Sequence, residues 1–434
     1  MDSPRRKITG QLLRSMSAVR GEQELPIIVQ YVPHRQVLRH AEFRAGWRES
    51  YSYRLAPFGH AHATREAIIT LEQDADVVRI YQDSPVHALL DAAPTQVGAP
   101  FAWAAGLTGA GVSLAILDTG IDPRHPDLAG RIVALYDVTG EGETDTNGHG
   151  THCAGIAAGT GRASGGLYRG IAPGLSLLST RVLDAYGNGM MSDVMAGIDW
   201  AVARGVQIIS LSLGGPGPAV GEDPLIEICN AAVEAGVMVC VAAGNTGPGQ
   251  MTIGSPGAAE RVLTVGAVDR QDAIASFSSR GPTGDGRIKP DIVLPGADIV
   301  SARATGTTLG RVVDAHYTTL SGTSMACPLA AGLCALALEA QPGLSPDELK
   351  RALMDSAIDL GQPANAQGAG RGDARNLFAA LGVALPAEPA MPPLPPLAEP
   401  VTPTPTVPTP GPETPQAPGC LVGWLSSLRR THKR

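Results

Sequence analysis

The chain has few aromatic residues and no excess of positive charge. Phe, Trp and Tyr together make up 4% of its 434 residues, and its formal net charge is −8. Because proteins that bind nucleic acid normally carry a basic face, this balance predicts that nucleic acid is not a partner. We interpret the mild excess of acidic residues as an ordinary solubilising surface.

The sequence also lacks a secretory signal, a long apolar run and paired cysteines. Residues 1–23 are charged and hold no apolar stretch, and no segment approaches the roughly 20 apolar residues that span a bilayer. The six cysteines are scattered through apolar segments without a CxxC pair, which favours buried free thiols over disulfides or a zinc site. We therefore expect a cytoplasmic location, with export by a non-classical route left open.

Glycine and proline, by contrast, are abundant. The chain holds 53 glycines and 36 prolines, which predicts many tight turns and a proline-rich segment. It is too long for one average domain. Changes in composition and in apolar pattern divide it into three regions: residues 1–96, 97–383 and 384–434.

The first region is predicted to be a small α+β domain. Residues 27–31 and 77–81 are short apolar segments with the composition of strands. Residues 64–71 have the spacing of a helix, with Thr64 as its N-cap.

The second region alternates apolar strands with amphipathic helices. Near-continuous apolar strands separated by helices predict a mainly parallel sheet covered on both faces, which is a three-layer α/β/α architecture. In such sheets, functional groups gather at the carboxyl ends of the strands. The expected strands are residues 112–117, 177–182, 206–213, 237–243 and 262–268, and the expected helices are residues 191–204, one that begins after Asp223 and one from Ser324 to about Ala340.

The third region reads as a proline-rich linker with no means of building a core. It ends in a short apolar stretch around Trp424, followed by basic residues. Such an end could lie on a membrane surface or contact a partner, and a disordered tail is the simpler interpretation.

Two segments of the second region place ionisable groups beside glycines. Asp118 follows an apolar strand, where a buried carboxylate must be paired or hydrogen-bonded; an Asp that caps a turn is the alternative. His149 lies among glycines at the expected start of a helix, with His152 three residues later. The two histidines could bind a metal ion, but Gly150 stands where the HExxH zinc motif has its glutamate.

Two further segments carry a hydroxyl and an amide. Ser324 stands at the expected start of a long apolar helix, where unpaired N–H groups favour the negative charge of an acyl-transfer oxyanion. Asn245 follows Gly244 at the end of an expected strand. Taken singly, a serine N-cap and a turn asparagine would explain these two residues.

Together and in this order, the segments resemble those of the subtilisin-like serine proteases. The matching segments are AILDTGID, NGHGTHCAG, LSLGG, AAGN and GTSMACP, and the resemblance covers about residues 97–383. It implies that Ser324 is the nucleophile, His149 its general base and Asp118 the residue that orients the imidazole. It also implies that Asn245 and the Ser324 N–H stabilise the oxyanion, and that the chemistry needs no cofactor.

The resemblance further implies how a polypeptide substrate binds. In this family the substrate pairs as an added strand between two segments of the enzyme. The residues that would form these segments are Ser212, Leu213 and Gly214 on one side and Gly187, Asn188 and Gly189 on the other. The residues that would wall the first specificity pocket are Ala242, Ala243, Gly244 and, near its base, Gly254. Their small size predicts room for a large apolar side chain.

By the same comparison, residues 1–96 are similar to the inhibitor-like propeptides of these proteases. Cleavage of this propeptide is expected within about residues 83–98. The protein would then be a monomeric serine endopeptidase that works through an acyl-enzyme and is made as an autoprocessed zymogen, with its own propeptide as intramolecular inhibitor. A non-inhibitory N-terminal domain is the alternative for this region.

Three other points bear on this interpretation. Asp127 matches a calcium ligand of several family members, but residues 160–170 lack their Asn-rich calcium segment, so a turn carboxylate is equally expected. His152 is structural by the same comparison. A catalytically silent binding protein with this fold would have lost a triad or oxyanion residue, and a serine esterase would carry Gly-x-Ser-x-Gly with its histidine last in the chain. This chain keeps every triad and oxyanion residue and lacks the esterase pattern.

Overall fold

The computed structural model describes residues 7–19, 23–32, 47–53, 55–83, 85–88, 96–215, 217 and 223–387. The proline-rich linker beyond residue 387, the apolar end around Trp424 and Cys420 lie outside the described residues. The expected cleavage region is described only in part, because residues 84 and 89–95 lie outside it as well.

The N-terminal region holds an antiparallel four-stranded sheet in the order β2-β3-β1-β4, accompanied by two helices. Its elements are α1 (Gly10–Ala18), β1 (Leu25–Tyr31), β2 (Trp47–Ser52), β3 (Phe58–Ala63), α2 (Arg65–Glu72) and β4 (Val77–Gln82). The two strands and the helix that the sequence predicts are confirmed as β1, β4 and α2. Thr64 caps α2 as expected, because its hydroxyl accepts a hydrogen bond from the Ala67 N–H at 3.3 Å.

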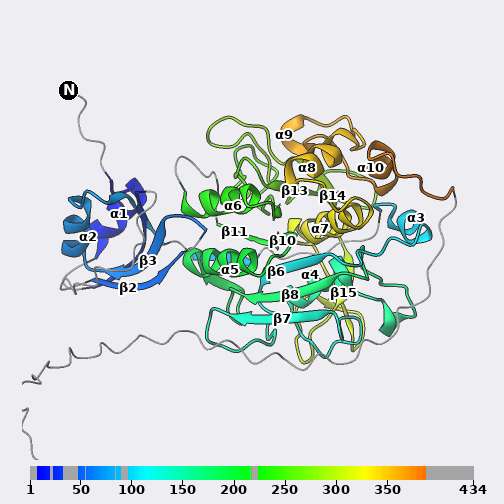
Figure 1. Ribbon diagram of the computed structural model, residues 1–434, viewed down its shortest axis with the longest axis horizontal. Helices are drawn as coiled ribbons and strands as arrows, with labels where there is room; N and C mark the ends of the chain where they lie inside the picture. The colour runs from blue at the N-terminus through cyan, green and yellow to red at the C-terminus, as the bar shows by residue number, and fades with distance from the viewer. Residues whose placement is uncertain are drawn as a thin grey trace, which may run out of the picture. The chain divides into compact units, whose positions relative to one another are not determined.

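A seven-stranded parallel sheet forms the centre of the second region, in the order β14-β13-β12-β10-β6-β8-β7 (Figure 1). Its strands are β6 (Ser113–Asp118), β7 (Ile132–Asp137), β8 (Ser176–Arg181), β10 (Ile208–Leu211), β12 (Met238–Ala242), β13 (Leu263–Val268) and β14 (Ile292–Pro295). The sequence pattern does not predict β7 and β14. β7 is an edge strand that is only partly buried, and β14 is short and ends in a proline.

Helices cover both faces of this sheet, which produces the three predicted layers (Figure 1). α4 (His149–Ala158) and α7 (Thr323–Ala340) share one core, whereas α5 (Met191–Ala203) and α6 (Pro224–Glu234) share the other. Alternate residues of β6 enter the two cores, because successive side chains of a strand point to opposite faces. Leu114 and Ile116 join the core of α4 and α7, and Ala115 and Leu117 join the core of α5 and α6.

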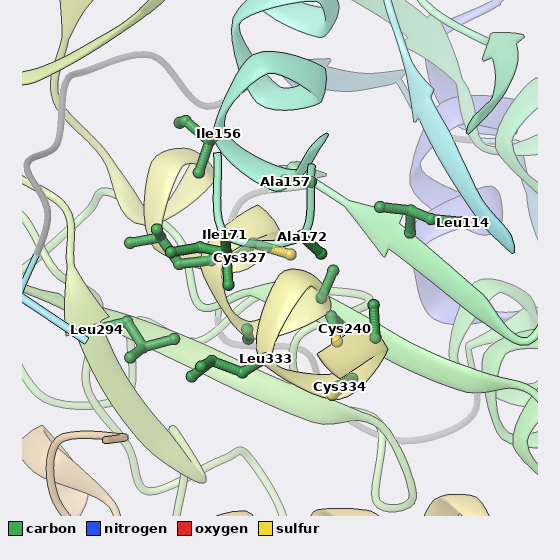
Figure 2. Packing of buried hydrophobic residues seen from close by; sticks show 14 of the residues in the cluster. Leu114, Ile156, Ala157, Ile171, Ala172, Cys240, Leu294, Cys327, Leu333 and Cys334 are labelled. Atoms are coloured by element: carbon green, nitrogen blue, oxygen red, sulfur yellow. The ribbon is translucent and has the colours of Figure 1, made fainter. Parts of the chain in front are cut away.

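Helix α7 runs through the middle of the larger core. Figure 2 shows its residue Leu333 beside Leu294 of β14 and its residue Cys334 beside Cys240 of β12. The mean hydropathy of α7 is 1.4, enough for a membrane span of its length, but 83% of the helix is buried inside the protein. It is therefore the core helix of a folded domain. All described cysteines, including those of α7, are buried and free, as the sequence predicts.

The strand expected over residues 206–213 is divided in two, which corrects the prediction. β10 ends at Leu211, and β11 (Leu213–Gly214) leaves the parallel sheet for a separate antiparallel sheet in the order β11-β5-β9. Its other strands are β5 (Pro85–Ala88) and β9 (Asn188–Met190). An apolar pattern cannot reveal this division, because the partners of β11 come from distant parts of the chain.

The remaining elements surround the parallel sheet. They are α3 (Ala99–Ala104), the short 3-10 helix η1 (Arg162–Ser164), β15 (Ile299–Ala302), β16 (Arg311–Val312), β17 (Tyr317–Leu320), α8 (Pro346–Asp355), α9 (Ala364–Gln367) and α10 (Ala374–Ala380). β15, β17 and β16 form a small antiparallel sheet in that order.

Candidate active site

Asp118 and His149 meet at the carboxyl end of β6. Asp118 is the last residue of β6, and His149 is the first residue of α4. The His149 Nδ1 lies 2.8 and 2.9 Å from the two carboxylate oxygens of Asp118, and both side chains are fully buried. Because the carboxylate accepts a hydrogen bond from Nδ1, the neutral ring carries its proton there, and Nε2 is the nitrogen that can accept another.

The charge of Asp118 also sets the basicity of His149. Burial by itself would lower the pKa of His149, but the Asp118 carboxylate raises it, and the resulting pKa lies well above 6.5. Burial raises the pKa of the Cys153 thiol, so this group stays protonated beside the ring. A buried imidazole that can hold a proton in this way is suited to general base catalysis.

A second buried carboxylate, Asp145, holds these two segments in place. It accepts hydrogen bonds from the Thr119 hydroxyl at 2.9 Å and from the Thr151 N–H at 2.9 Å. The Thr119 hydroxyl in turn accepts a bond from the Gly150 N–H at 3.0 Å. Asp145 therefore links the first turn of α4 to the residue after Asp118. The motifs do not point to Asp145, although a carboxylate just before a helix is a recognisable capping signal.

Ser324 is the second residue of α7, which begins at Thr323. The alternative of a simple serine N-cap is therefore wrong. The Ser324 Oγ donates to the Ser212 carbonyl at 3.2 Å, and the Ser212 hydroxyl donates to the Ser324 carbonyl at 2.8 Å. The Cys153 Sγ lies 3.5 Å from the Ser324 carbonyl oxygen and 4.0 Å from the His149 Nδ1. Ser324 and His149 thus flank the same thiol.

Asn245 contacts the start of α7 through Thr323. The Asn245 Oδ1 accepts hydrogen bonds from the Thr323 N–H at 3.0 Å and from its hydroxyl at 3.1 Å. The same hydroxyl accepts a bond from the Gly244 N–H at 3.1 Å. These contacts turn the carboxamide oxygen toward Thr323 and its NH₂ group away from it. Thr323 is thus a positioning residue that the motifs do not single out, although it directly precedes Ser324.

The two segments expected to hold substrate flank another part of the same chain. β5 pairs antiparallel with β11, with Ala88 opposite Leu213. On its other edge β5 pairs antiparallel with β9, with Val86 opposite Gly189. Backbone groups of both segments are therefore bonded to an extended strand, which is the arrangement expected for a bound polypeptide.

Three more of the expected cleft residues lie beside these pairs. Gly187 directly precedes β9 and has a φ of 80°. Ser212 directly precedes β11, and Gly214 ends it opposite His87.

The expected pocket residues lie after β12. Ala242 is its last residue, and Ala243 follows, also buried. Gly244 has a φ of 111°, and a Cβ there would lie 2.8 Å from the Ser279 Oγ. At Gly254 a Cβ would lie 2.1 Å from a backbone carbonyl oxygen. Larger side chains are excluded at both glycines, because neighbouring atoms already occupy the space.

Comparison with known proteins identifies the family. Residues 109–372 match the subtilase family. Serine protease AprX of Bacillus subtilis is 41% identical over 344 residues, which are 73% of this chain and 78% of that protein. The chain belongs to the subtilase family. M-protease of Shouchella clausii is 36% identical over 315 residues (72% of this chain, 77% of that protein), and subtilisin DY of Bacillus licheniformis is 40% identical over 261 residues (59% and 88%).

The protein is a subtilisin-like serine endopeptidase. The family match and the names of its relatives confirm the resemblance that the motifs indicated. The α/β fold expected with that resemblance is confirmed by the parallel sheet and its two helical layers.

His152 of this subtilase faces a backbone carbonyl. Its Nε2 lies 3.2 Å from the Thr318 carbonyl oxygen. Burial lowers the pKa of His152 to about 3, so the ring is neutral and donates from Nε2. Within the described ranges, the metal-donor cluster at this place consists of Asp118, His149 and Cys153 and does not include His152. The alternative of a two-histidine metal site therefore has no support.

The surroundings of Asp127 do not fit a calcium ion. One carboxylate oxygen accepts a hydrogen bond from the Tyr317 hydroxyl at 2.7 Å, and the other accepts one from the Ala163 N–H at 2.9 Å. Calcium requires six to eight oxygen ligands, whereas both partners here are hydrogen-bond donors. The donor set indicates a hydrogen-bonded carboxylate that ties η1 to β17.

We expect stability at this place to depend on Tyr317 and to be insensitive to chelation. Tyr317→Phe would leave a buried carboxylate oxygen without its donor, which costs about 1–3 kcal/mol and lowers Tm by a few degrees. Thermal unfolding of wild type with and without EDTA, and of the variant, measures both effects. Tyr186→Phe, at an 84% exposed tyrosine, is the matched control. A large drop in Tm with EDTA would contradict the assignment.

Proposed function

We propose that Ser324, His149 and Asp118 are the catalytic triad and hydrolyse peptide bonds of extended polypeptides through an acyl-enzyme. The Ser324 hydroxyl attacks the scissile carbonyl carbon while His149 Nε2 accepts its proton, and Asp118 stabilises the imidazolium. His149 then donates the proton to the leaving amine, and water hydrolyses the serine ester. The short contacts of 2.8 and 2.9 Å between His149 Nδ1 and the Asp118 carboxylate support these roles.

The oxyanion of each tetrahedral intermediate would be stabilised by two donors. These are the side-chain NH₂ of Asn245 and the backbone N–H of Ser324, in the first turn of α7, where the helix dipole also favours negative charge. The hydrogen bonds from Thr323 to the Asn245 Oδ1 support this role. They hold the carboxamide in one orientation before any substrate arrives, so that little reorganisation is needed during the reaction.

Residues 1–96 are proposed to be an inhibitory propeptide. The observation that carries this proposal is the pairing of β5 with both β9 and β11. A polypeptide substrate would use the same backbone N–H and C=O groups. β5 and a substrate therefore cannot occupy these strands at the same time, and the segment must be cut and released before the enzyme acts on other chains.

Polar contacts from the N-terminal region to α5 and α6 support a stable inhibitory complex. Asp83 accepts hydrogen bonds from the Ser192 N–H at 2.9 Å and from its hydroxyl at 2.6 Å, at the start of α5. The Tyr53 hydroxyl donates to the Ser192 carbonyl at 2.9 Å, and Gln30 donates to Glu227 of α6 at 3.0 Å. Apolar side chains of β1, β3 and β4 also share a core with α5 and α6.

Asp83→Ala is expected to weaken inhibition by the propeptide about tenfold. The change removes a helix cap and leaves a buried hydroxyl and N–H of Ser192 without their acceptor, losses of about 1–2 kcal/mol. The measurement is the time from the start of refolding of the full-length chain to the onset of peptide hydrolysis, compared at equal amounts of processed enzyme. Weaker inhibition should shorten this lag. An assay at pH 8 keeps the carboxylate ionised in wild type, because burial raises the pKa of Asp83 to about 7.

Glu66→Ala is the matched control for this experiment. Glu66 is an exposed carboxylate on α2, so the lag of the Glu66→Ala variant should equal that of wild type. A lag that is unchanged in Asp83→Ala would contradict the proposed inhibitory contact.

A further inference from the structure

Arg181 ends β8 as a buried arginine beside the proposed triad. It lies opposite Asp118 in the parallel register of β8 and β6, and only 1% of its surface is exposed. An arginine is always charged in a protein, and a buried charge is tolerated only when its hydrogen-bonding groups have partners. The acceptors of this guanidinium therefore identify the segments that it holds together.

These acceptors lie in the segment that leads to His149. The two terminal nitrogens of Arg181 donate to oxygens of residues 141–146, namely the carbonyls of Gly142 and Thr144 (both at 2.9 Å), the Thr146 hydroxyl (3.2 Å) and the Glu141 carboxylate. Because the fork of donors is rigid and planar, it fixes these oxygens relative to one another. One buried guanidinium thus sets the shape of the segment before the catalytic helix α4.

Side chains of the same part of the chain bind both backbone groups of Ala185. The Glu141 carboxylate accepts a hydrogen bond from the Ala185 N–H at 3.0 Å, and the Asn147 NH₂ group donates to the Ala185 carbonyl at 3.0 Å. The Asn147 Oδ1 accepts a bond from the His149 N–H at 3.2 Å. Ala185 is therefore clamped between a carboxylate that Arg181 holds and an amide that contacts the proposed general base.

Ala185 belongs to a turn that leads into β9. The Asp184 N–H donates to the Asn188 carbonyl at 2.7 Å. The Asp184 carboxylate accepts hydrogen bonds from the Tyr186 and Asn188 N–H groups, both at 2.8 Å. The turn and Asn188, the first residue of β9, therefore form one hydrogen-bonded unit. A clamp on Ala185 fixes the place of this strand as well.

We propose that Arg181, through Glu141, is a positioning residue that holds β9 ready for substrate, a role that rests on the proposed function of the cleft. Without the clamp on Ala185, β9 would have to become ordered as a polypeptide binds, which weakens binding. The loss falls only on a substrate long enough to pair with β9. Bond breaking at Ser324 would proceed as before once the substrate is bound.

Glu141→Ala tests this role with two substrates. The Glu141 side chain is 43% exposed, and Arg181 keeps its carbonyl and hydroxyl acceptors in the variant. One substrate is a chromogenic peptide with four residues before the scissile bond, and the other is a single-residue ester that is too short to pair with β9. Full-length chains are folded first, and an added protease then removes the N-terminal region.

We expect KM for the peptide to rise about five- to tenfold, the effect of losing a hydrogen bond to a charged group. Its kcat, and both constants for the ester, should stay within about twofold of wild type, because the lost contact acts on binding alone. Glu141→Gln keeps an acceptor for the Ala185 N–H and should give a peptide KM between those of wild type and Glu141→Ala. Arg181→Lys keeps the charge without the planar fork and should also raise the peptide KM.

Glu234→Ala is the matched control. Glu234 forms the same kind of pair, with Arg261 at 3.0 Å, at the end of α6, so its loss should leave both substrates unaffected. In Glu141→Ala, an unchanged peptide KM or equal losses with peptide and ester would overturn the inference while the proposed function stands. Wild type that hydrolyses neither substrate would overturn both.

Discussion

Ser324→Ala is expected to lower kcat for peptide hydrolysis by about 10⁶, the size of the loss found when the corresponding serine of subtilisin is removed. The hydroxyl is the atom that forms the acyl-enzyme, and no neighbouring group can replace it. The Cys153 thiol is close, but burial raises its pKa, so it does not supply a thiolate. The measurement is steady-state hydrolysis of a chromogenic peptide by wild type and variant after an added protease has removed the N-terminal region from both, because the variant is not expected to cut itself.

The matched control is Ser321→Ala, the same change three residues earlier. The Ser321 hydroxyl accepts a bond from the Asp298 N–H at 3.4 Å and lies outside the proposed machinery, so kcat should stay within a few-fold of wild type. Ser324→Ala should unfold near the temperature of wild type, since the change removes one small hydroxyl group, which bonds to the Ser212 carbonyl. Undiminished hydrolysis by Ser324→Ala would mean that this residue is not the nucleophile.

Asp118→Asn is expected to lower kcat by about 10⁴, as the equivalent change does in another serine protease with the same triad. The amide has nearly the shape of the carboxylate, but its NH₂ group favours the wrong tautomer of His149, with the proton on Nε2. That nitrogen could then no longer accept the proton of Ser324. The neutral amide would also fail to stabilise the imidazolium that forms during the reaction.

The pH profile separates this role from a structural one. In wild type the pKa of His149 is raised well above 6.5. The ring becomes a base only as the pH rises through this pKa. The acid limb of the pH profile, where kcat/KM increases with pH, should therefore lie above pH 6.5. Asp118→Asn removes the charge that raises this pKa, and the limb should move to lower pH. Asp122→Asn, at a buried carboxylate bonded to the Arg124 and Thr305 N–H groups, should leave the limb unmoved. An acid limb that stays at the same pH in Asp118→Asn would show that the Asp118 charge does not raise the pKa of His149.

Much of the catalytic region could be predicted from the chain because its signals are local. A buried parallel strand such as β6 is apolar at nearly every position, and a glycine or a carboxylate directly precedes α4, α6 and α7. Asp118 ends such a strand, and His149 and Ser324 lie in the first turns of such helices, so the sequence places all three at element ends where side chains can converge. Their order and flanks then indicated the subtilase family, which comparison confirmed.

Other features depended on partners that the sequence does not reveal. Asp127 has the neighbours of a family calcium ligand, yet its oxygens bond to Tyr317 and to the Ala163 N–H. Thr323 orients Asn245 although 78 positions separate them. The expected strand 206–213 is divided at Ser212, because residues beyond that point pair with β5 instead of with the parallel sheet.

The sequence alone thus determined the fold class, the family and the residues capable of the chemistry. Strand periodicity and helix caps depend only on residues that are close together in the sequence. Only the tertiary structure decided which oxygen each donor contacts and which residues of the N-terminal region lie opposite β11. Hydrogen-bond saturation and strand register are properties of segments brought together from far along the chain, and no short window of sequence contains both partners.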